Sequence, residues 1–174
     1  MQILTFGNEM LREKAAPAVN LESGPSTPPW DTLSWAETAQ KMFDALSEEK
    51  GIGLAGPQIG LPERVFITNV ENDVPRVFIN PSIIETSEKT AKCEEGCLSV
   101  PGAWAVVERP ETVKVQAWNE KGRPFTIEAG GIVARVIQHE YDHLEGVLFI
   151  DRISEIKRKK ILDKIAKKAG KHER

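Results

Sequence analysis

The chain has 174 residues, of which 40% are hydrophobic and 28% charged, and these values are typical of one globular domain spanning residues 1–174. A formal net charge of −3 gives no general attraction to nucleic acid or anionic membranes, and no apolar run approaches the ~20 residues that span a bilayer. Because the N-terminus lacks the layout of a signal peptide and two cysteines do not suggest a disulfide framework, we expect a cytoplasmic protein.

The first predicted elements are a loop and a helix. Pro, Ser and Gly are concentrated in ESGPSTPPW at 22–30, which predicts a surface loop. From Trp35 to Leu46 apolar residues recur with helical spacing, and Gly51 ends the predicted helix. Runs of β-branched and aromatic residues between turn residues then predict strands, at 64–70, 76–84, 111–119 and 124–129.

Two further helices are predicted in the last third of the chain. No breaker interrupts 131–144, and Gly146 is a suitable C′ residue. A basic helix follows at about 153–169. Strands followed by helices, without a βαβ alternation, predict an α+β fold.

His139, Glu140 and His143 form the pattern His-Glu-x-x-His within the predicted helix 131–144. Residues i and i+4 of a helix lie on one face about 5–6 Å apart, so two imidazoles there can bind one ion through bonds of about 2.0–2.1 Å. In this pattern the glutamate acts as a general base toward water at the metal. The pattern fixes only three positions, and a charged helix that carries it by chance is an equally good interpretation of these residues alone.

A third ligand has to come from elsewhere in the chain. His172 lies near the C-terminus, so a site of three histidines is not expected. Asp163, at twenty residues past His143, would complete the site of a zinc peptidase. It lies among lysines, however, where an ion pair with Lys159 or Lys167 is the simpler interpretation. The cysteines are therefore the best source of a third ligand.

Both cysteines lie in the segment KCEEGCLSVPG, at positions 93 and 97. A closed structural zinc site of both cysteines and both helix histidines is one possibility. In an extended segment, however, Cys93 and Cys97 would be about 13 Å apart, too far to share an ion. One cysteine with two histidines would instead leave a fourth position open for water, as in catalytic sites. We expect Cys93 to be a small buried hydrophobic residue, and the assignment of Cys97 depends on the motifs that follow.

The loop GIGLAGPQIG, at 51–60, contains the pattern Gly-x-Gly-x-x-Gly. A dinucleotide site would need a strand before this loop and a helix after it, and a phosphate loop would need Gly-Lys-Ser/Thr. Neither context is present, so both nucleotide-binding interpretations are rejected. Glycine permits close approach of the backbone to a ligand, and this is the function that the loop predicts.

The segments GIGLAGPQ, EGCLS and QHEYDH, in this order and spacing, resemble the three signature motifs of the peptide deformylase family. The chain is similar to that family along nearly its whole length. The resemblance implies an α+β fold with antiparallel strands packed around a central helix that bears HExxH, followed by a C-terminal helix. It also implies a metal-dependent hydrolase that removes the N-formyl group from the formyl-methionine of newly synthesised polypeptides and releases formate. One divalent metal ion is expected per chain, Fe(II) in the cell, with zinc, nickel or cobalt able to occupy the site.

The resemblance also implies roles for individual residues. The residues that match the metal ligands of the family are Cys97, His139 and His143. Glu140 matches the catalytic acid/base, while the Gln58 side chain and the backbone N–H of Leu98 match the groups that hold the developing oxyanion. The backbone of Gly53 would align the substrate. Glu95 would contact the metal ligands without binding the metal itself, with Arg109 as its candidate partner.

Helical spacing places Ile132 and Val136 on the metal-facing side of their helix, because they precede His139 by seven and three residues. Together with Ile52 they are expected to line an apolar pocket for methionine, with burial in the general core as the rival interpretation. Position 56 is glycine where the family usually has alanine, which predicts a more flexible loop. Neither this departure nor the 22–30 loop touches an expected ligand.

Ten basic and three acidic residues lie between Arg152 and Arg174. The basic helix has two interpretations, a solvated face and, as the resemblance suggests, contact with ribosomal RNA phosphates. The chain is expected to be monomeric. Two rival functions stay open at this point: a zinc peptidase with Asp163 as a distal ligand, and a non-enzymatic module with a structural zinc held by both cysteines and both helix histidines.

Overall fold

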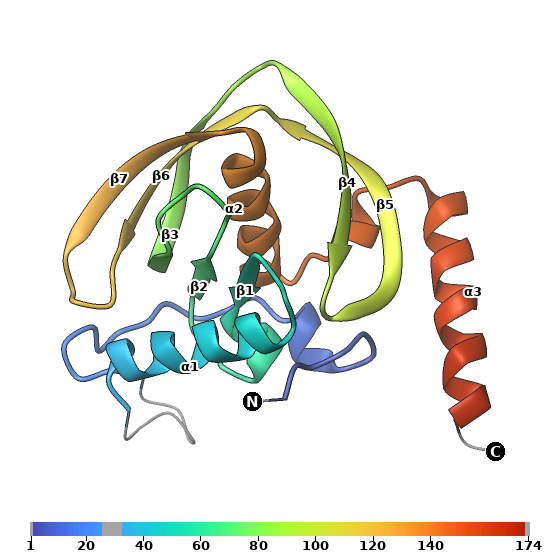
Figure 1. Ribbon diagram of the computed structural model, residues 1–174, viewed down its shortest axis with the longest axis horizontal. Coiled ribbons are helices and arrows are strands. Elements are labelled where there is room, and N and C mark those ends of the chain that lie inside the picture. The colour runs from blue at the N-terminus through green and yellow to red at the C-terminus, as the bar shows by residue number, and fades with distance from the viewer. Residues whose placement is uncertain (1, 26–32, 173–174) are drawn as a thin grey trace.

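The computed structural model describes residues 2–25 and 33–172, with side chains as far as Lys167. The strands of the described chain form two antiparallel sheets (Figure 1). The larger sheet has the order β1-β2-β3-β6-β7, with strands at Gly53–Ala55, Val65–Thr68, Arg76–Thr86, Thr112–Trp118 and Pro124–Gly130. The smaller sheet is a hairpin of β4 and β5, at Thr90–Cys97 and Val100–Pro110.

Helix α1, Trp35–Glu48, covers one part of the core. It begins with a capping box, in which Ser34 and Glu37 exchange side-chain to backbone hydrogen bonds. Its buried apolar face belongs to a cluster that also contains residues of β1, β2 and β3. The predicted helix at 35–46 is therefore present, and it ends shortly before Gly51.

Helix α2, Gly131–Leu144, lies in the middle of the molecule, between the larger sheet and the β4–β5 hairpin (Figure 1). Ala134, Ile137 and Leu144 bury its apolar face in a cluster with Phe66 and Phe78 of the larger sheet. The face toward the hairpin carries polar side chains instead. Apolar contacts with the larger sheet and polar contacts with the hairpin therefore hold α2, the helix that bears the histidines, in place.

Helix α3, Glu155–His172, lies outside β5 at the edge of the molecule (Figure 1). Ile161, Leu162 and Ile165 pack against a cluster that includes Val107 of β5 and Phe149. The remaining described helices are 3-10 turns at Glu9–Arg12 (η1), Gly56–Ile59 (η2) and Phe149–Asp151 (η3). Within the residues described, no helix has both the length and the apolar character needed to cross a membrane.

The expected α+β architecture, with antiparallel strands around a central helix and a further helix at the C-terminal end, is confirmed. The predicted helix at 131–144 has the observed bounds. Strands β1, β4 and β5 were not predicted. The segment of β5 contains Pro101 and Gly102, two residues that are uncommon inside strands. Residues 26–30 of the predicted 22–30 loop lie outside the described residues.

Candidate metal centre and catalytic pocket

The helical spacing of His139 and His143 brings their imidazole rings together on α2. The ring centroids lie 5.2 Å apart. His143 is fully buried, and the Nε2 atom of its ring lies 3.2 Å from Cys97 Sγ. One ligand atom from each of Cys97, His139 and His143 lies within 4.8 Å of the others.

Cys97 is the last residue of β4, where the hairpin register shifts between Gly96 and Cys97. Burial opposes ionisation of its thiol, but the charges and hydrogen bonds of His143 and His139 outweigh burial and hold the pKa of Cys97 well below its usual value. A thiolate and two imidazoles are suitable donors for Fe(II) or zinc. Two donors bound to one ion at usual bond lengths lie about 3.5 Å apart, close to the observed Sγ–Nε2 distance. The residues present therefore fit a divalent ion.

Glu95 lies directly behind His139. Its Oε2 atom is 2.9 Å from His139 Nδ1, a contact that directs the other ring nitrogen toward the ligand cluster. Arg109 binds both oxygens of Glu95, at 2.7 and 2.9 Å, and Arg135 Nη1 donates to Oε1 at 3.0 Å. Burial opposes the carboxylate, but the hydrogen bonds from Arg109 and His139 lower the pKa of Glu95. The structure thus places Arg109 as the partner of Glu95.

The negative groups around His139 favour a positive charge at the site. Burial alone would lower the pKa of His139, but contacts with Cys97, Glu95 and Glu140 raise it well above the usual value. The same negative groups would attract a metal cation. This charge balance is a second sign that the cluster is built for an ion.

Glu140 follows His139 and lines the cavity, and only 4% of it is exposed. Its Oε2 atom is buried and has no hydrogen-bond partner in the described part of the chain. Burial raises the pKa of Glu140 to about 7, against the opposing charges of His139 and His143. A carboxyl group in this state can take up and release a proton near neutral pH.

Gln58 lies in η2, and only 2% of it is exposed. Its Oε1 atom accepts from the backbone N–H of Ala55 at 2.8 Å. Its Nε2 atom donates to Ser99 Oγ at 3.1 Å and contacts Cys97 Sγ at 3.6 Å. Leu98 follows Cys97 directly and lines the same cavity.

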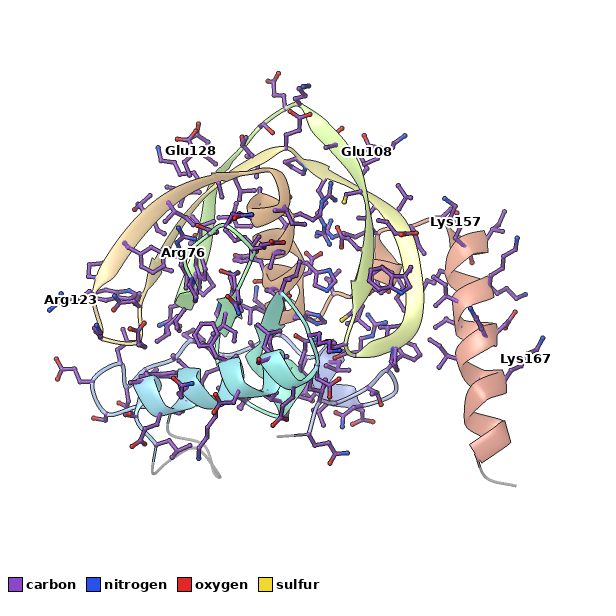
Figure 2. The ribbon with its side chains drawn as sticks, in the orientation of Figure 1. Arg76, Glu108, Arg123, Glu128, Lys157 and Lys167 are labelled. Atoms are coloured by element: carbon purple, nitrogen blue, oxygen red, sulfur yellow. The ribbon has the colours of Figure 1, made fainter. Side chains whose placement is uncertain are left out.

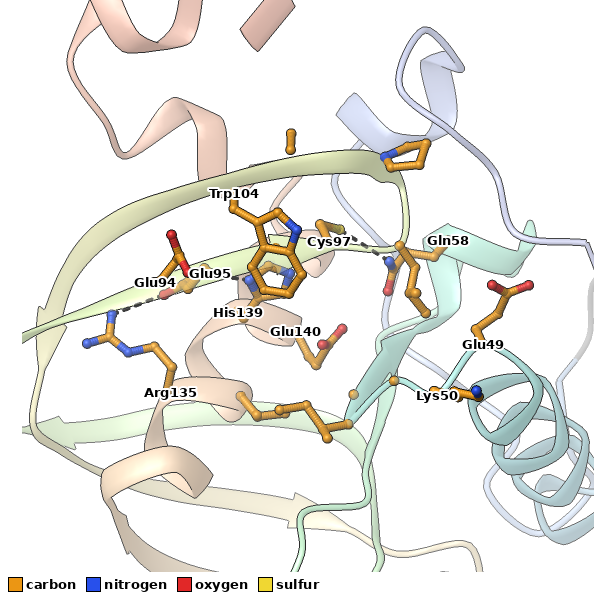
Figure 3. Close-up of a pocket in the computed structure, with 18 of the residues that line it drawn as sticks. Glu49, Lys50, Gln58, Glu94, Glu95, Cys97, Trp104, Arg135, His139 and Glu140 are labelled. Carbon is orange, nitrogen blue, oxygen red and sulfur yellow. Dashed lines mark hydrogen bonds and ion pairs between the residues drawn. The ribbon is translucent and has the colours of Figure 1, made fainter. Parts of the chain in front are cut away.

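The cavity at the ligand cluster has a volume of about 550 Å³ (Figure 3). The sequence-predicted residues that line it are Ile52, Gly53, Gln58, Glu95, Cys97, Leu98, Ile132, Val136, His139 and Glu140. Val136 is buried, whereas Ile52 and Ile132 are 44% and 48% exposed. Because these two large apolar residues are exposed beside the cavity, an apolar side chain of a substrate can pack against them.

Gly56 has little free space around it. It is buried, and a Cβ there would lie 3.0 Å from the carbonyl oxygens of Leu61 and Glu63. A side chain at position 56 would therefore require its neighbours to shift slightly, and the expected flexibility of the loop stays a prediction.

The expectation that Cys93 is a buried hydrophobic residue was wrong. Cys93 is exposed, because it lies on the edge strand β4 and lines an open cavity with Ala91 and Ile132. It is not part of the ligand cluster. Asp163 lies exposed on α3 and is not part of that cluster either.

Sequence reasoning missed Arg135 and Ser99. Arg135 precedes His139 by four residues and therefore shares its helix face. It also donates to the carbonyl oxygens of Ala91 on β4 and Val107 on β5, at 2.6 and 3.1 Å. This helical spacing was the available signal for Arg135, whereas Ser99 offered only its place in the EGCLS motif.

Comparison with known proteins identifies the family. The family model described as polypeptide deformylase matches residues 1–159. The chain belongs to the polypeptide deformylase family. Among curated relatives, the peptide deformylase of Brucella suis biovar 1 is 46% identical over 136 residues, which cover 76% of this chain and 78% of the relative. That of Neisseria meningitidis serogroup C is 50% identical over 133 residues, covering 75% and 78%.

Solved structures of this family share the fold. A peptide deformylase from Legionella pneumophila superposes with a TM-score of 0.85 at 34% identity, covering 99% of this chain and 97% of that one. The peptide deformylase of Ehrlichia chaffeensis, solved in complex with actinonin, superposes with a TM-score of 0.87 at 30% identity, covering 97% and 96%.

As a deformylase, the protein is a metal-dependent hydrolase that removes the N-formyl group from formyl-methionyl polypeptides and releases formate. Family membership and the ligand cluster overturn both rival interpretations. A structural zinc module would need Cys93, and the peptidase alternative would need Asp163, and neither residue is part of the cluster.

Proposed function

We propose that Cys97, His139 and His143 hold one divalent ion, Fe(II) in the cell, and that Glu140 carries the proton in the reaction. The supporting observation is that Cys97, His139 and the buried Glu140 line a single cavity, while the fully buried His143 completes the ligand cluster with Nε2 at 3.2 Å from Cys97 Sγ. Because only three protein ligands are present in the cluster, a fourth position is left for water or substrate. A thiolate ligand suits the softer divalent ions, and zinc, nickel or cobalt would occupy the same site.

Bound there, the ion would supply Lewis acidity toward the formyl carbonyl and toward water. Glu140 takes one proton from the attacking water as the new C–O bond forms. It then gives this proton to the amine nitrogen as the C–N bond breaks, so that formate and a free N-terminal amine leave. Burial of Glu140 raises its pKa, which suits this carboxyl group to take up a proton and release it again.

The Gln58 side-chain amide and the backbone N–H of Leu98 are the proposed donors to the oxyanion. Gln58 contacts Cys97 Sγ, and Leu98 is the next residue along the chain, so both lie beside the ligand cluster. One such donor is typically worth about 2.7–4 kcal/mol of transition-state stabilisation. The backbone of Gly53 aligns the substrate chain, since this residue lies against Glu140 on the cavity wall.

The methionine side chain is proposed to lie among Ile52, Ile132 and Val136. All three line the cavity. The two isoleucines are partly exposed, so a bound thioether side chain would cover apolar surface that water otherwise contacts.

The ligand set is tested by metal content after purification without oxygen. Cys97→Ser is expected to lose the ion, because a hydroxyl is a poor replacement for a thiolate. Cys93→Ser is the matched control and is expected to retain one ion per chain, since Cys93 is exposed and outside the cluster. Full metal retention by Cys97→Ser, or loss by Cys93→Ser, would contradict the proposal. The metal content of the wild-type protein tests the assignment of Fe(II).

Contact of α3 with the ribosome is also proposed. The helix is docked through Ile161, Leu162 and Ile165. The lysines whose side chains are described, at 157, 159, 160, 164 and 167, are exposed. Lys157 and Lys167 project away from the rest of the molecule (Figure 2). A row of exposed cations on one helix is suited to the phosphates of ribosomal RNA.

A ribosome pelleting assay tests this contact. Replacing the exposed Lys157, Lys160 and Lys167 by Ala should weaken binding and reduce its dependence on salt, while hydrolysis of a formyl-methionyl tripeptide stays unchanged. Triple replacement of Lys41, Lys89 and Lys121, which are exposed elsewhere, removes the same charge and should bind like wild type. Equal binding of both triple variants would refute the proposal.

We further propose that the chain works as a monomer in the cytoplasm and folds as one domain over residues 1–174. Light scattering should give the mass of one chain, 19.3 kDa. Urea should unfold the metal-free protein in a single transition detected equally by fluorescence and circular dichroism. Separate transitions would indicate more than one folding unit.

A further inference from the structure

A buried hydrogen bond joins Gln58 to Ser99 beside the ligand cluster. Gln58 belongs to η2, whereas Ser99 lies in the turn between β4 and β5. Gln58 Nε2 donates to Ser99 Oγ at 3.1 Å, and the Ser99 residue has no exposed surface. Ser99 does not line the cavity, so any effect it has on the reaction passes through another residue.

The orientation of the Gln58 amide is fixed by its neighbours. The backbone N–H of Ala55 can only donate, so the group that faces it has to be the Oε1 oxygen. The Nε2 group therefore points toward Ser99 and Cys97, as Figure 3 shows for the contact with Cys97. An NH₂ group has two protons. Donation of one to Ser99 leaves the second on the Cys97 side.

Backbone bonds from the N-terminal segment hold both partners in place. The N–H of Leu4 donates to the carbonyl oxygen of Gln58, and the N–H of Phe6 donates to that of Ser99, both at 2.7 Å. One short segment thus connects η2 to the hairpin turn. The hydroxyl of Ser99 is consequently presented from a fixed backbone rather than from a mobile turn.

We propose that Ser99 is a positioning residue for deformylation. Its buried hydroxyl accepts one Gln58 Nε2 proton and thereby keeps the second proton directed toward the place where the oxyanion forms. This inference rests on the proposed role of Gln58 as an oxyanion donor. Without the hydroxyl, the amide keeps only the hydrogen bond from Ala55 and the longer contact with Cys97 Sγ, and it turns more freely about its last side-chain torsion.

A double-mutant cycle tests the proposal. The quantities measured are kcat and KM for formate release from a formyl-methionyl tripeptide by nickel-loaded protein. We expect Gln58→Ala to lower kcat about 10²–10³-fold, as for other oxyanion donors. Ser99→Ala should lower kcat about tenfold, the value of one well-placed hydrogen bond, with KM nearly unchanged. In the Gln58→Ala background, Ser99→Ala should have almost no effect on kcat.

The outcomes distinguish the positioning role of Ser99 from the role of Gln58 as an oxyanion donor. An equal loss from Ser99→Ala in both backgrounds, or no loss in the wild-type background, would overturn the positioning role. A Gln58→Ala variant with wild-type kcat would instead remove the proposed role of Gln58. Thr38→Val is the matched control, because it deletes another fully buried hydroxyl, on α1, and should leave kcat unchanged.

A spectroscopic measurement decides the case even where Ser99→Ala does not fold. In zinc-loaded wild-type protein, the two Gln58 Nε2 protons are assigned by NMR from their loss in Gln58→Ala. Two well-separated signals that exchange slowly with solvent are the expected result, because the amide is anchored at both ends. Averaged, rapidly exchanging signals in the wild-type protein would overturn the proposal.

Discussion

Gly53 lies against the carboxyl end of Glu140: a Cβ on Gly53 would be 2.9 Å from Glu140 Cδ and 2.7 Å from Val136 Cγ1. These distances are shorter than carbon–carbon contacts in folded proteins. Strand β1 and helix α2 approach each other this closely only because position 53 has no side chain. The glycine therefore determines where the Glu140 carboxyl can rest.

Gly53→Ala should displace the Glu140 carboxyl from the cavity wall. We expect kcat for formate release to fall by at least about tenfold, because a misplaced general base loses much of its effect. Metal content should stay at one ion per chain, since the ligands are not touched. Gly130→Ala is the control, because a Cβ there would meet Thr112 Cγ2 at an ordinary 3.6 Å. Wild-type kcat in Gly53→Ala would show that the carboxyl can move without cost.

Arg109 joins two buried carboxylates, Glu95 and Asp142, each at 2.7 Å. Arg109→Leu should destabilise the metal-free protein by about 3 kcal/mol, the lower end for a broken buried pair, since Glu95 keeps Arg135 and Asp142 keeps Arg152. Urea unfolding measures this loss. Arg76→Leu, which breaks the partly exposed pair with Asp73, should cost less than about 1 kcal/mol. Similar losses in the two variants would mean that the buried network adds little to stability.

The histidine pair could be predicted from the sequence because its geometry is local. Four residues on a helix place His139 and His143 on one face whatever the rest of the chain does. Cys97 is different, because its position depends on where the β4–β5 hairpin lies relative to α2. No local pattern determines that packing, so the assignment of Cys97 came only from the resemblance of the three motifs.

Contacts between distant segments account for the other residues that were missed. Ser99 meets Gln58 across two loops that are 41 residues apart in the sequence. Cys93 was predicted to be buried because free cysteine usually is, but the edge of a two-stranded sheet leaves it exposed. Composition describes which residues favour burial, and only the tertiary arrangement decides which positions are covered.

Removing the metal should lower thermal stability. An ion that binds only the folded state at a free concentration of 100 times its Kd contributes about 2.7 kcal/mol. For a chain of this size that corresponds to a fall in Tm of roughly 5–10 °C on adding a chelator. Scanning calorimetry measures the shift. In Cys97→Ser the chelator should change Tm far less, and an equal shift there would place the stabilising ion elsewhere.

Ile132→Ala should alter the choice of substrate rather than the fold. Ile132 is 48% exposed beside the cavity, so its truncation should change the free energy of unfolding by less than about 0.5 kcal/mol. The kcat/KM ratio between formyl-methionyl and formyl-alanyl peptides should fall about tenfold, because the longer side chain loses its apolar contact. Ile84→Ala, with 47% exposure on β3, is the matched control. An unchanged kcat/KM ratio would show that Ile132 does not contact the methionine side chain of the substrate.

The most direct test of the catalytic arrangement is formate release from a formyl-methionyl tripeptide by anaerobically purified, Fe(II)-loaded protein, with Glu140→Gln measured in parallel. We predict steady formate production by the wild type and a loss of at least about 10²-fold in Glu140→Gln at equal metal content, because glutamine cannot carry the proton. Formate release by Glu140→Gln at the wild-type rate would contradict the role of Glu140. No formate from wild-type protein that holds one ion per chain would contradict the proposed centre as a whole.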